Sequence, residues 1–189
     1  MLDIACGYGW YSKLARDTFH KEVIGIDLDK RETIDFEFHV CDLEKWIPEF
    51  KDKEFDTVFA FDIIEHIHHE EELIKDIARV CKDTVIVSVP YKDDSLLRKH
   101  YLTTVARIDP THVRYYDWPE LAEKFAKLWF EIVSVKREGQ LSPGFIAEFF
   151  PRRMRKIVWI FFHGLYKLKI LYNEKIAWDV FIVAKRKWR

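Results

Sequence analysis

The sequence predicts an α/β fold built on a doubly wound, mostly parallel sheet. Short apolar runs and amphipathic helical stretches alternate five times along the chain, which is the pattern of repeated strand-helix-strand units. The run at residues 55–61 is nearly continuous in apolar residues, as a central parallel strand covered on both faces requires. A chain of 189 residues suits one domain, and we expect a single domain over residues 1–189.

The first strand should run from residue 2 into a turn that contains Gly7 and Gly9. Glycine lets a ligand approach the backbone closely, and the first N–H groups of the following helix offer hydrogen-bond donors. The helix predicted at residues 10–19 carries Trp10, Leu14 and Ala15 at helical spacing, with Phe19 one turn further on. We therefore expect one face of this helix to pack on the sheet.

The next elements follow in order. Strands are expected at residues 23–27, 35–40, 55–61 and 84–89, with a loop around 44–54 and a helix at 69–81. Residues 91–116 lack a clean period, although Leu96, Leu97 and Tyr101 suit a short helix. Asp117 should cap a helix that reaches about residue 128, with Pro119 in its first turn. A sixth strand is expected at residues 130–136.

A helical insertion is predicted at about residues 139–175, before a last strand at 177–184. Turn residues lead into a segment from Arg152 to Leu171, whose centre at 157–162 is apolar and whose two ends are basic. This pattern resembles an interfacial helix more than a spanning one and suggests peripheral membrane or lipid contact. A helix that packs on the core or forms a homo-oligomer is the alternative.

Charge is distributed unevenly. Residues 151–189 hold eleven Lys or Arg against two acids, a balance of +9, while the whole chain carries −1. A basic end suits nucleic acid, an anionic membrane, an acidic substrate or an ordinary solvated surface. Cys6, Cys41 and Cys81 lack the short paired spacing of metal sites and should be free thiols. With no signal peptide or apolar run of ~20 residues, a cytoplasmic protein is expected.

Two carboxylates end the second and third apolar runs. Asp27 lies about twenty residues after the glycine turn, where it would face a ribose across the top of a parallel sheet, and Asp42 ends the third run. Together with residues 2–9 and the segment 55–66, which ends in Glu65-His66, they resemble the class I S-adenosylmethionine-dependent methyltransferases. The resemblance covers nearly the whole chain, and it is closest to small-molecule enzymes with a Glu-His pair after the fourth strand.

This resemblance implies a Rossmann-like, seven-stranded sheet whose last strand is antiparallel. It implies S-adenosyl-L-methionine as the cofactor, no metal, and O- or C-methylation of a small-molecule acceptor. The acceptor would be apolar or lipid-like if the insertion covers the site or touches lipid. Nucleic acid is not expected as a partner, because no Pro-Pro-aromatic triplet follows the fourth strand to stack a flipped base.

The resemblance also implies which residues meet the cofactor. Asp3 and the turn would meet its methionine part, Asp27 its ribose hydroxyls and Asp42 its adenine amino group. Leu28 and Leu43 would enclose the adenine, and the backbone of Phe61 would take the ammonium group. The implied cofactor-binding residues are Asp3, Ala5, Gly7, Tyr8, Gly9, Asp27, Leu28, Asp42, Leu43, Phe61 and Asp62.

The candidate catalytic residues are Glu65, His66 and His112. Glu65-His66 follows the fourth strand, where the proton of an acceptor could be removed. Pro110 keeps its neighbourhood extended, which places His112 and Arg114 on one side of the chain. A neutral imidazole could accept a hydroxyl proton, and Arg114 could hold an acidic group of the acceptor. A bonded loop histidine, with His66 as the base, is the alternative.

Two other functions are left open by the residues. A nicotinamide dehydrogenase would need a third small residue near position 12, which Ser12 could supply, but the second acid Asp42 and the acid-rich stretch 62–65 argue against it. A module that binds S-adenosylmethionine without turnover is the non-enzymatic alternative.

Overall fold

The computed structural model describes residues 1–45, 49–93, 95–99, 104–138, 147–148, 150–168, 177 and 179–187. The predicted loop residues 46–48, Tyr101, the turn residues 139 and 142–144 and the end of the insertion helix at 169–171 lie outside these ranges.

A seven-stranded sheet organises the chain in the order β3-β2-β1-β4-β5-β7-β6. Its strands are β1 (Leu2–Ile4), β2 (Ile24–Asp27), β3 (Glu37–Val40), β4 (Phe55–Phe61), β5 (Cys81–Pro90), β6 (Phe130–Glu138) and β7 (Asp179–Arg186). The first five strands run parallel, and β7 lies antiparallel between β5 and β6. The predicted Rossmann-like α/β sheet with an antiparallel last strand is therefore confirmed.

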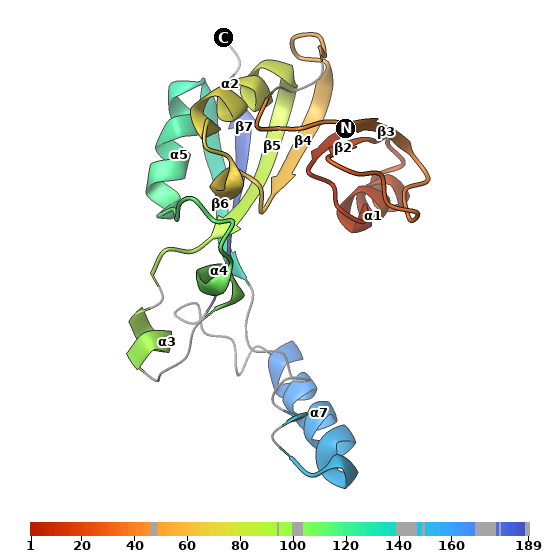
Figure 1. Cartoon of the computed structure of the whole chain (residues 1–189), viewed down its shortest axis with the longest axis vertical. Helices are drawn as coiled ribbons and strands as arrows, with labels where there is room; N and C mark the ends of the chain where they lie inside the picture. The colour runs from red at the N-terminus through yellow and green to blue at the C-terminus, as the bar shows by residue number, and fades with distance from the viewer. Residues whose placement is uncertain are drawn as a thin grey trace.

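Helices connect and cover these strands. The longer ones are α1 (Trp10–Phe19), α2 (Glu70–Val80), α5 (Trp118–Lys127) and α7 (Arg152–Lys167). Three helices are short: η1 (Ile64–His66), α3 (Ser95–Lys99) and α4 (Val105–Ile108). The first follows β4, and the other two lie in the segment 91–116, where the sequence has no clean period. Figure 1 shows α2 and α5 together against the part of the sheet that contains β5, β6 and β7.

The main core lies between this pair of helices and the sheet. Val58, Val85 and Ile182 come from three neighbouring strands, while Ile77 and Phe125 come from α2 and α5, and all are fully buried or nearly so. Burial of such side chains contributes about 1.5–3 kcal/mol each. The three cysteines are buried, and none forms a disulfide among the described residues.

The predicted packing face of α1 is confirmed for Ala15 and wrong for its three large apolar residues. Trp10, Leu14 and Phe19 are 74%, 63% and 64% exposed, whereas Ser12 and Ala15 are buried. The Ser12 hydroxyl donates to the Asp3 carboxylate on β1, so small side chains let α1 approach the sheet closely. The large apolar residues then have no room on the inner face and point outward.

The start of α5 is confirmed without its expected capping bond, and the start of β5 differs from the prediction. Asp117 occupies the position before α5 with extended backbone, but its side chain makes no capping hydrogen bond and lies 3.7 Å from Lys92 Nζ. Strand β5 begins at Cys81, directly after α2, and continues to Pro90, which pairs with Asp179. Pro90 is tolerated because it is the last residue of the strand.

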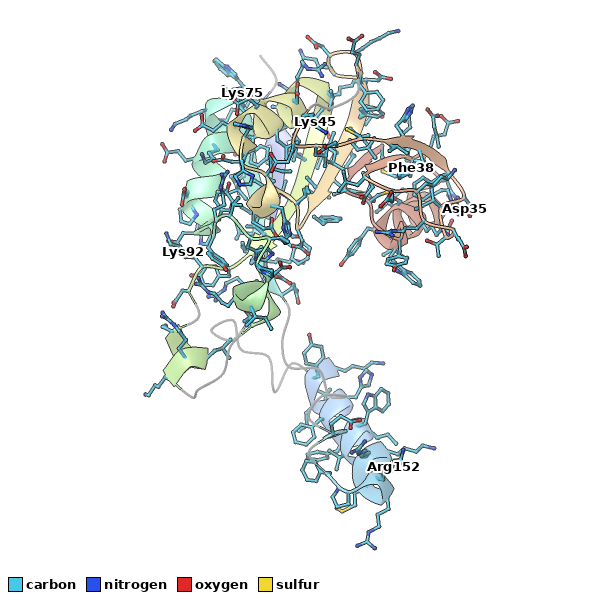
Figure 2. All side chains as sticks on the ribbon, viewed as in Figure 1. Asp35, Phe38, Lys45, Lys75, Lys92 and Arg152 are labelled. Carbon is cyan, nitrogen blue, oxygen red and sulfur yellow. The ribbon has the colours of Figure 1, made fainter. Side chains whose placement is uncertain are left out.

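Helix α7 lies apart from the sheet (Figure 1). It is on the side of the sheet where the parallel strands β4 and β5 end. None of its residues is buried, and Figure 2 shows side chains leaving it on all sides, with Arg152 at its beginning. Among the helices that the structure describes, none has the length and apolar content to cross a membrane.

Candidate active site

A pocket with a volume of ≈ 400 Å³ opens where β1 to β4 end. This volume is within the range of about 300–1,000 Å³ that small-molecule sites occupy. Its lining comes from four successive connections: Ala5, Asp27, Leu28, Asp42, Leu43, Glu44, Asp62, Ile63, His66 and Ile67. The topology thus brings together six of the residues that the sequence pointed to for the cofactor.

The turn after β1 depends on left-handed backbone. Gly7 and Gly9 have φ of 54° and 71°, which glycine adopts without a steric penalty. A Cβ on Gly9 would lie 2.7 Å from Ile34 Cδ1, whereas a Cβ on Gly7 would meet nothing within 4 Å. Gly9 is therefore required for packing, and the space above Gly7 is open to a ligand.

Asp27 ties this turn to the end of β2. Its Oδ2 accepts the Gly7 N–H at 2.8 Å and its Oδ1 accepts the Leu28 N–H at 2.7 Å. A carboxylate oxygen has two lone pairs, so each oxygen can still accept from a hydroxyl in the pocket. The arrangement holds the carboxylate in one orientation before any ligand arrives.

Asp42 and Asp62 are also held in place. Lys45 Nζ lies 2.8 Å from Asp42 Oδ2, and this hydrogen bond holds the pKa of Asp42 below its usual value. Asp62 has a left-handed φ of 49° and accepts the Ser88 hydroxyl at 2.7 Å. The pocket is therefore surrounded by three oriented carboxylates, which are hydrogen-bond acceptors for hydroxyl and amino groups.

Five of the predicted cofactor residues lie outside the pocket lining: Asp3, Gly7, Tyr8, Gly9 and Phe61. Asp3 is buried beneath the turn, where burial raises its pKa to about 6. The Tyr8 side chain is 57% exposed, and the Phe61 ring packs edge-on against Tyr11 at 4.7 Å between centroids.

Glu65, His66 and His112 form a cluster beside the pocket. One potential ligand atom from each lies within 4.8 Å of those of the other two, and the two imidazole rings meet edge-on at 4.4 Å. The Glu65 side chain is fully buried, and burial raises its pKa to about 8. Burial also lowers the pKa of His112, which favours the neutral imidazole. His66 lines the pocket, so the cluster adjoins it.

Arg114, predicted to hold an acidic group of the acceptor, has partners within the chain. Its guanidinium forms an ion pair with Glu70 on α2 and donates to the His68 carbonyl at 3.0 Å. This pair anchors the loop that carries His112 to α2.

Three neighbours of the site were not predicted from the sequence. Glu44 lines the pocket and accepts hydrogen bonds from the backbone and the ring of His68, the latter at 2.7 Å. Thr111 and Asp109 form hydrogen bonds around His66. The Asp-Pro-Thr-His order at 109–112 was the one available signal, because Asp and Thr before a histidine favour local side-chain hydrogen bonds.

Comparison with known proteins places this fold. Residues 2–89 match the family model of a methyltransferase domain, whereas a search of curated protein sequences gave no match. An S-adenosylmethionine-dependent methyltransferase from Archaeoglobus fulgidus is similar with a TM-score of 0.65 at 21% identity, over 98% of this chain and 85% of that one.

Two further solved structures show the range of proteins with this fold. A chain in the complex of the Haloferax volcanii Trm112 methyltransferase activator with a methyltransferase has a TM-score of 0.64 at 17% identity, over 99% of this chain and 82% of that one. The [4+2]-cyclase SpnF has a TM-score of 0.61 at 17% identity, over 100% and 75%. At these identities the likeness concerns the fold alone.

The family model gives the type of domain, which the likeness of folds does not. It begins with β1 and continues through nearly all of β5, and it therefore includes every connection that lines the pocket. The nicotinamide dehydrogenase alternative is accordingly set aside. Residues 2–89 are therefore assigned to a methyltransferase domain, and the sheet order β3-β2-β1-β4-β5-β7-β6 shows that the rest of the chain completes its fold.

Proposed function

We propose that the chain is an S-adenosylmethionine-dependent methyltransferase that binds its cofactor in the pocket beside Asp27 and methylates a hydroxyl or carbon of a small-molecule acceptor. The observation that carries the proposal is the set of oriented carboxylates at Asp27, Asp42 and Asp62 around one pocket. Donor groups of a ribose and an adenine match such acceptors, and Leu28 and Leu43 add apolar walls.

S-adenosylmethionine, when bound, supplies an electrophilic methyl group on its sulfonium. The residues of the chain then align the acceptor with that methyl group and exclude water. His66 and His112 adjoin the pocket and could take up the acceptor proton. The Glu65 carboxyl beneath them is shielded from solvent.

We further propose an apolar or lipid-like acceptor. Helix α7 lies on the side of the sheet toward which the parallel strands run (Figure 1), and the pocket is formed where those strands end. Ile157, Ile160 and Phe161 on this helix are 71%, 55% and 60% exposed. Apolar surface on the same side of the sheet as the pocket favours an acceptor with an apolar portion.

Calorimetry on Asp27→Ala tests the cofactor site. Removing the carboxylate leaves the ribose donors without acceptors, at a cost of roughly 1–3 kcal/mol per buried group. We expect S-adenosylmethionine to bind at least about tenfold more weakly. The matched control is Asp56→Ala, an exposed carboxylate on β4 whose partner is Lys82. Unchanged affinity in Asp27→Ala would exclude this site, and tight NAD binding by the wild type would reinstate the dehydrogenase alternative.

Turnover must be tested separately from binding, because a module without turnover would also bind the cofactor. We expect His112→Ala to keep its affinity for S-adenosylmethionine while methyl transfer to an identified acceptor falls ~10²–10⁴-fold. The demethylated cofactor can be quantified by mass spectrometry. Normal turnover in His112→Ala combined with its loss in His66→Ala would instead assign the base to His66.

A further inference from the structure

The Glu65 carboxyl is a buried polar group without a partner. Both of its oxygens are inaccessible to solvent and have no hydrogen bond among the described residues, although the Glu65 backbone carbonyl accepts the Val113 N–H at 3.0 Å. An unsatisfied buried acceptor costs about 1–3 kcal/mol and calls for an explanation. Negative charge on Asp62, Asp109 and Asp179 acts on the same carboxyl. Such surroundings favour a bound cation.

The His66 ring is oriented by Thr111. The Thr111 hydroxyl donates its proton to Asp109 Oδ1 at 2.5 Å, so its oxygen can only accept from His66 Nδ1, which lies 2.9 Å away. His66 Nδ1 must then carry the proton, and the Nε2 lone pair is left available. A histidine that binds a metal almost always donates its other ring N–H in this way.

The His112 ring has the complementary arrangement. Its Nδ1 is buried without a hydrogen-bond partner, while its Nε2 faces Asp109 Oδ2 at 3.8 Å. Asp109 therefore acts on both imidazoles, through Thr111 on one and directly on the other. Each of the three side chains therefore offers an atom that can bind a metal ion.

We propose that Glu65, His66 and His112 bind a divalent transition-metal ion, and that the two imidazoles serve as its ligands in place of taking up the acceptor proton. Their ligand atoms lie within 4.8 Å of one another, whereas ligands about 2.1 Å from a common ion are roughly 3–3.5 Å apart. Closing the cluster takes side-chain movements of about 1 Å. The site departs from the sequence-based expectation of no metal, because His112 is distant in the sequence and the histidines near Glu65 gave no usable spacing.

The ligand set selects the class of ion. Two imidazoles and one carboxylate suit Zn²⁺, Fe²⁺, Co²⁺ or Mn²⁺, whereas Mg²⁺ and Ca²⁺ prefer sets made of oxygen alone. Three protein ligands leave coordination positions free. Because His66 also lines the pocket, the metal site adjoins the space assigned to the cofactor. Resting on the proposed function, this geometry selects acceptors that offer an oxygen ligand, such as a hydroxyl beside the methylated atom.

Metal binding can be measured without the cofactor, which separates this inference from the proposed function. The full chain would be stripped with a chelator, titrated with Zn²⁺ or Mn²⁺ alone by calorimetry, and assayed for bound metal after dialysis. We expect one equivalent to bind. Glu65→Gln and His112→Ala should each bind at least about tenfold more weakly, and Thr111→Val about 10–100-fold more weakly because the His66 ring loses its orienting acceptor.

His68→Ala is the matched control. His68 is two residues from His66, but its ring is exposed and bonded to Glu44, so its removal should leave the metal affinity unchanged. A Co²⁺ absorption spectrum of the wild type tests the coordination even if a variant fails to fold. The inference is overturned if the wild type retains no stoichiometric metal, or if His68→Ala loses as much affinity as His112→Ala.

Discussion

The carboxyl group of Asp3 is buried beneath the glycine turn, with Ser12 as its hydrogen-bond donor. Burial raises its pKa from 3.8 to about 6. The folded chain therefore holds a proton between these values that the unfolded chain has released. Stability from this group is complete below pH 3.8 and is lost as the pH rises through about 6. The loss should be roughly 2–3 kcal/mol in the free energy of unfolding.

Urea unfolding of the wild type and Asp3→Asn between pH 4 and 7 measures this effect. The asparagine can still accept from Ser12 but cannot titrate, so the wild type should lose stability relative to the variant across this range. Ser12→Ala should extend the loss to higher pH, because the Ser12 hydrogen bond lowers the pKa of Asp3. Parallel pH profiles for the wild type and Asp3→Asn would contradict the prediction.

Pocket residues at the ends of strands were easier to predict than the contacts that anchor the loops around the pocket. Asp27, Asp42 and Asp62 could be assigned to one pocket because the carboxyl ends of parallel strands meet at one edge of the sheet. The partners of Arg114 could not be predicted. Its ion pair with Glu70 joins a loop to a helix that lies 44 positions earlier in the sequence, and nothing in the local pattern indicates that distance.

At the scale of elements, apolar spacing predicted the presence of helices better than the direction of their faces. Residues 10–19 form α1 as expected, but the face toward β1 belongs to Ser12 and Ala15. Leu121 and Phe125 of α5 are buried as helical spacing indicates. The difference is that α5 packs into the wide core with α2, whereas α1 approaches the sheet through a polar contact at Asp3.

Strand boundaries show the same dependence on distant partners. The apolar run at 84–89 predicted β5, but the strand begins earlier, at Cys81. These first residues are extended because of contacts that the local sequence does not show. Arg186 of β7 donates to the Cys81 carbonyl at 2.8 Å, which holds the beginning of the strand from 105 residues away in the sequence. Such long-range hydrogen bonds override local propensity.

At the scale of the whole molecule, charge and apolar surface meet at α7. The basic side chains of Arg152, Arg153 and Lys156 are exposed near its beginning, and the carboxyl-terminal segment 151–189 carries a balance of +9. At 100° per residue, Met154, Ile157 and Phe161 share one face of the helix. A basic end and an apolar face on one exposed helix are the properties of an interfacial helix.

We therefore predict that the full chain binds vesicles containing anionic lipid at 0.1 M salt, and releases them at 1 M. Each basic residue near an anionic surface contributes about 1 kcal/mol, and the Debye length falls from about 10 Å to about 3 Å between these salt concentrations. Flotation with vesicles of phosphatidylcholine and phosphatidylserine measures the bound fraction. Ile157→Glu combined with Phe161→Glu should abolish binding at both salt concentrations, because two charges would enter the apolar face. Lys82→Glu, a charge reversal on β5, is the control that should still bind. Absence of binding by the wild type at low salt would leave α7 only a packing role, against a second copy or another part of the chain.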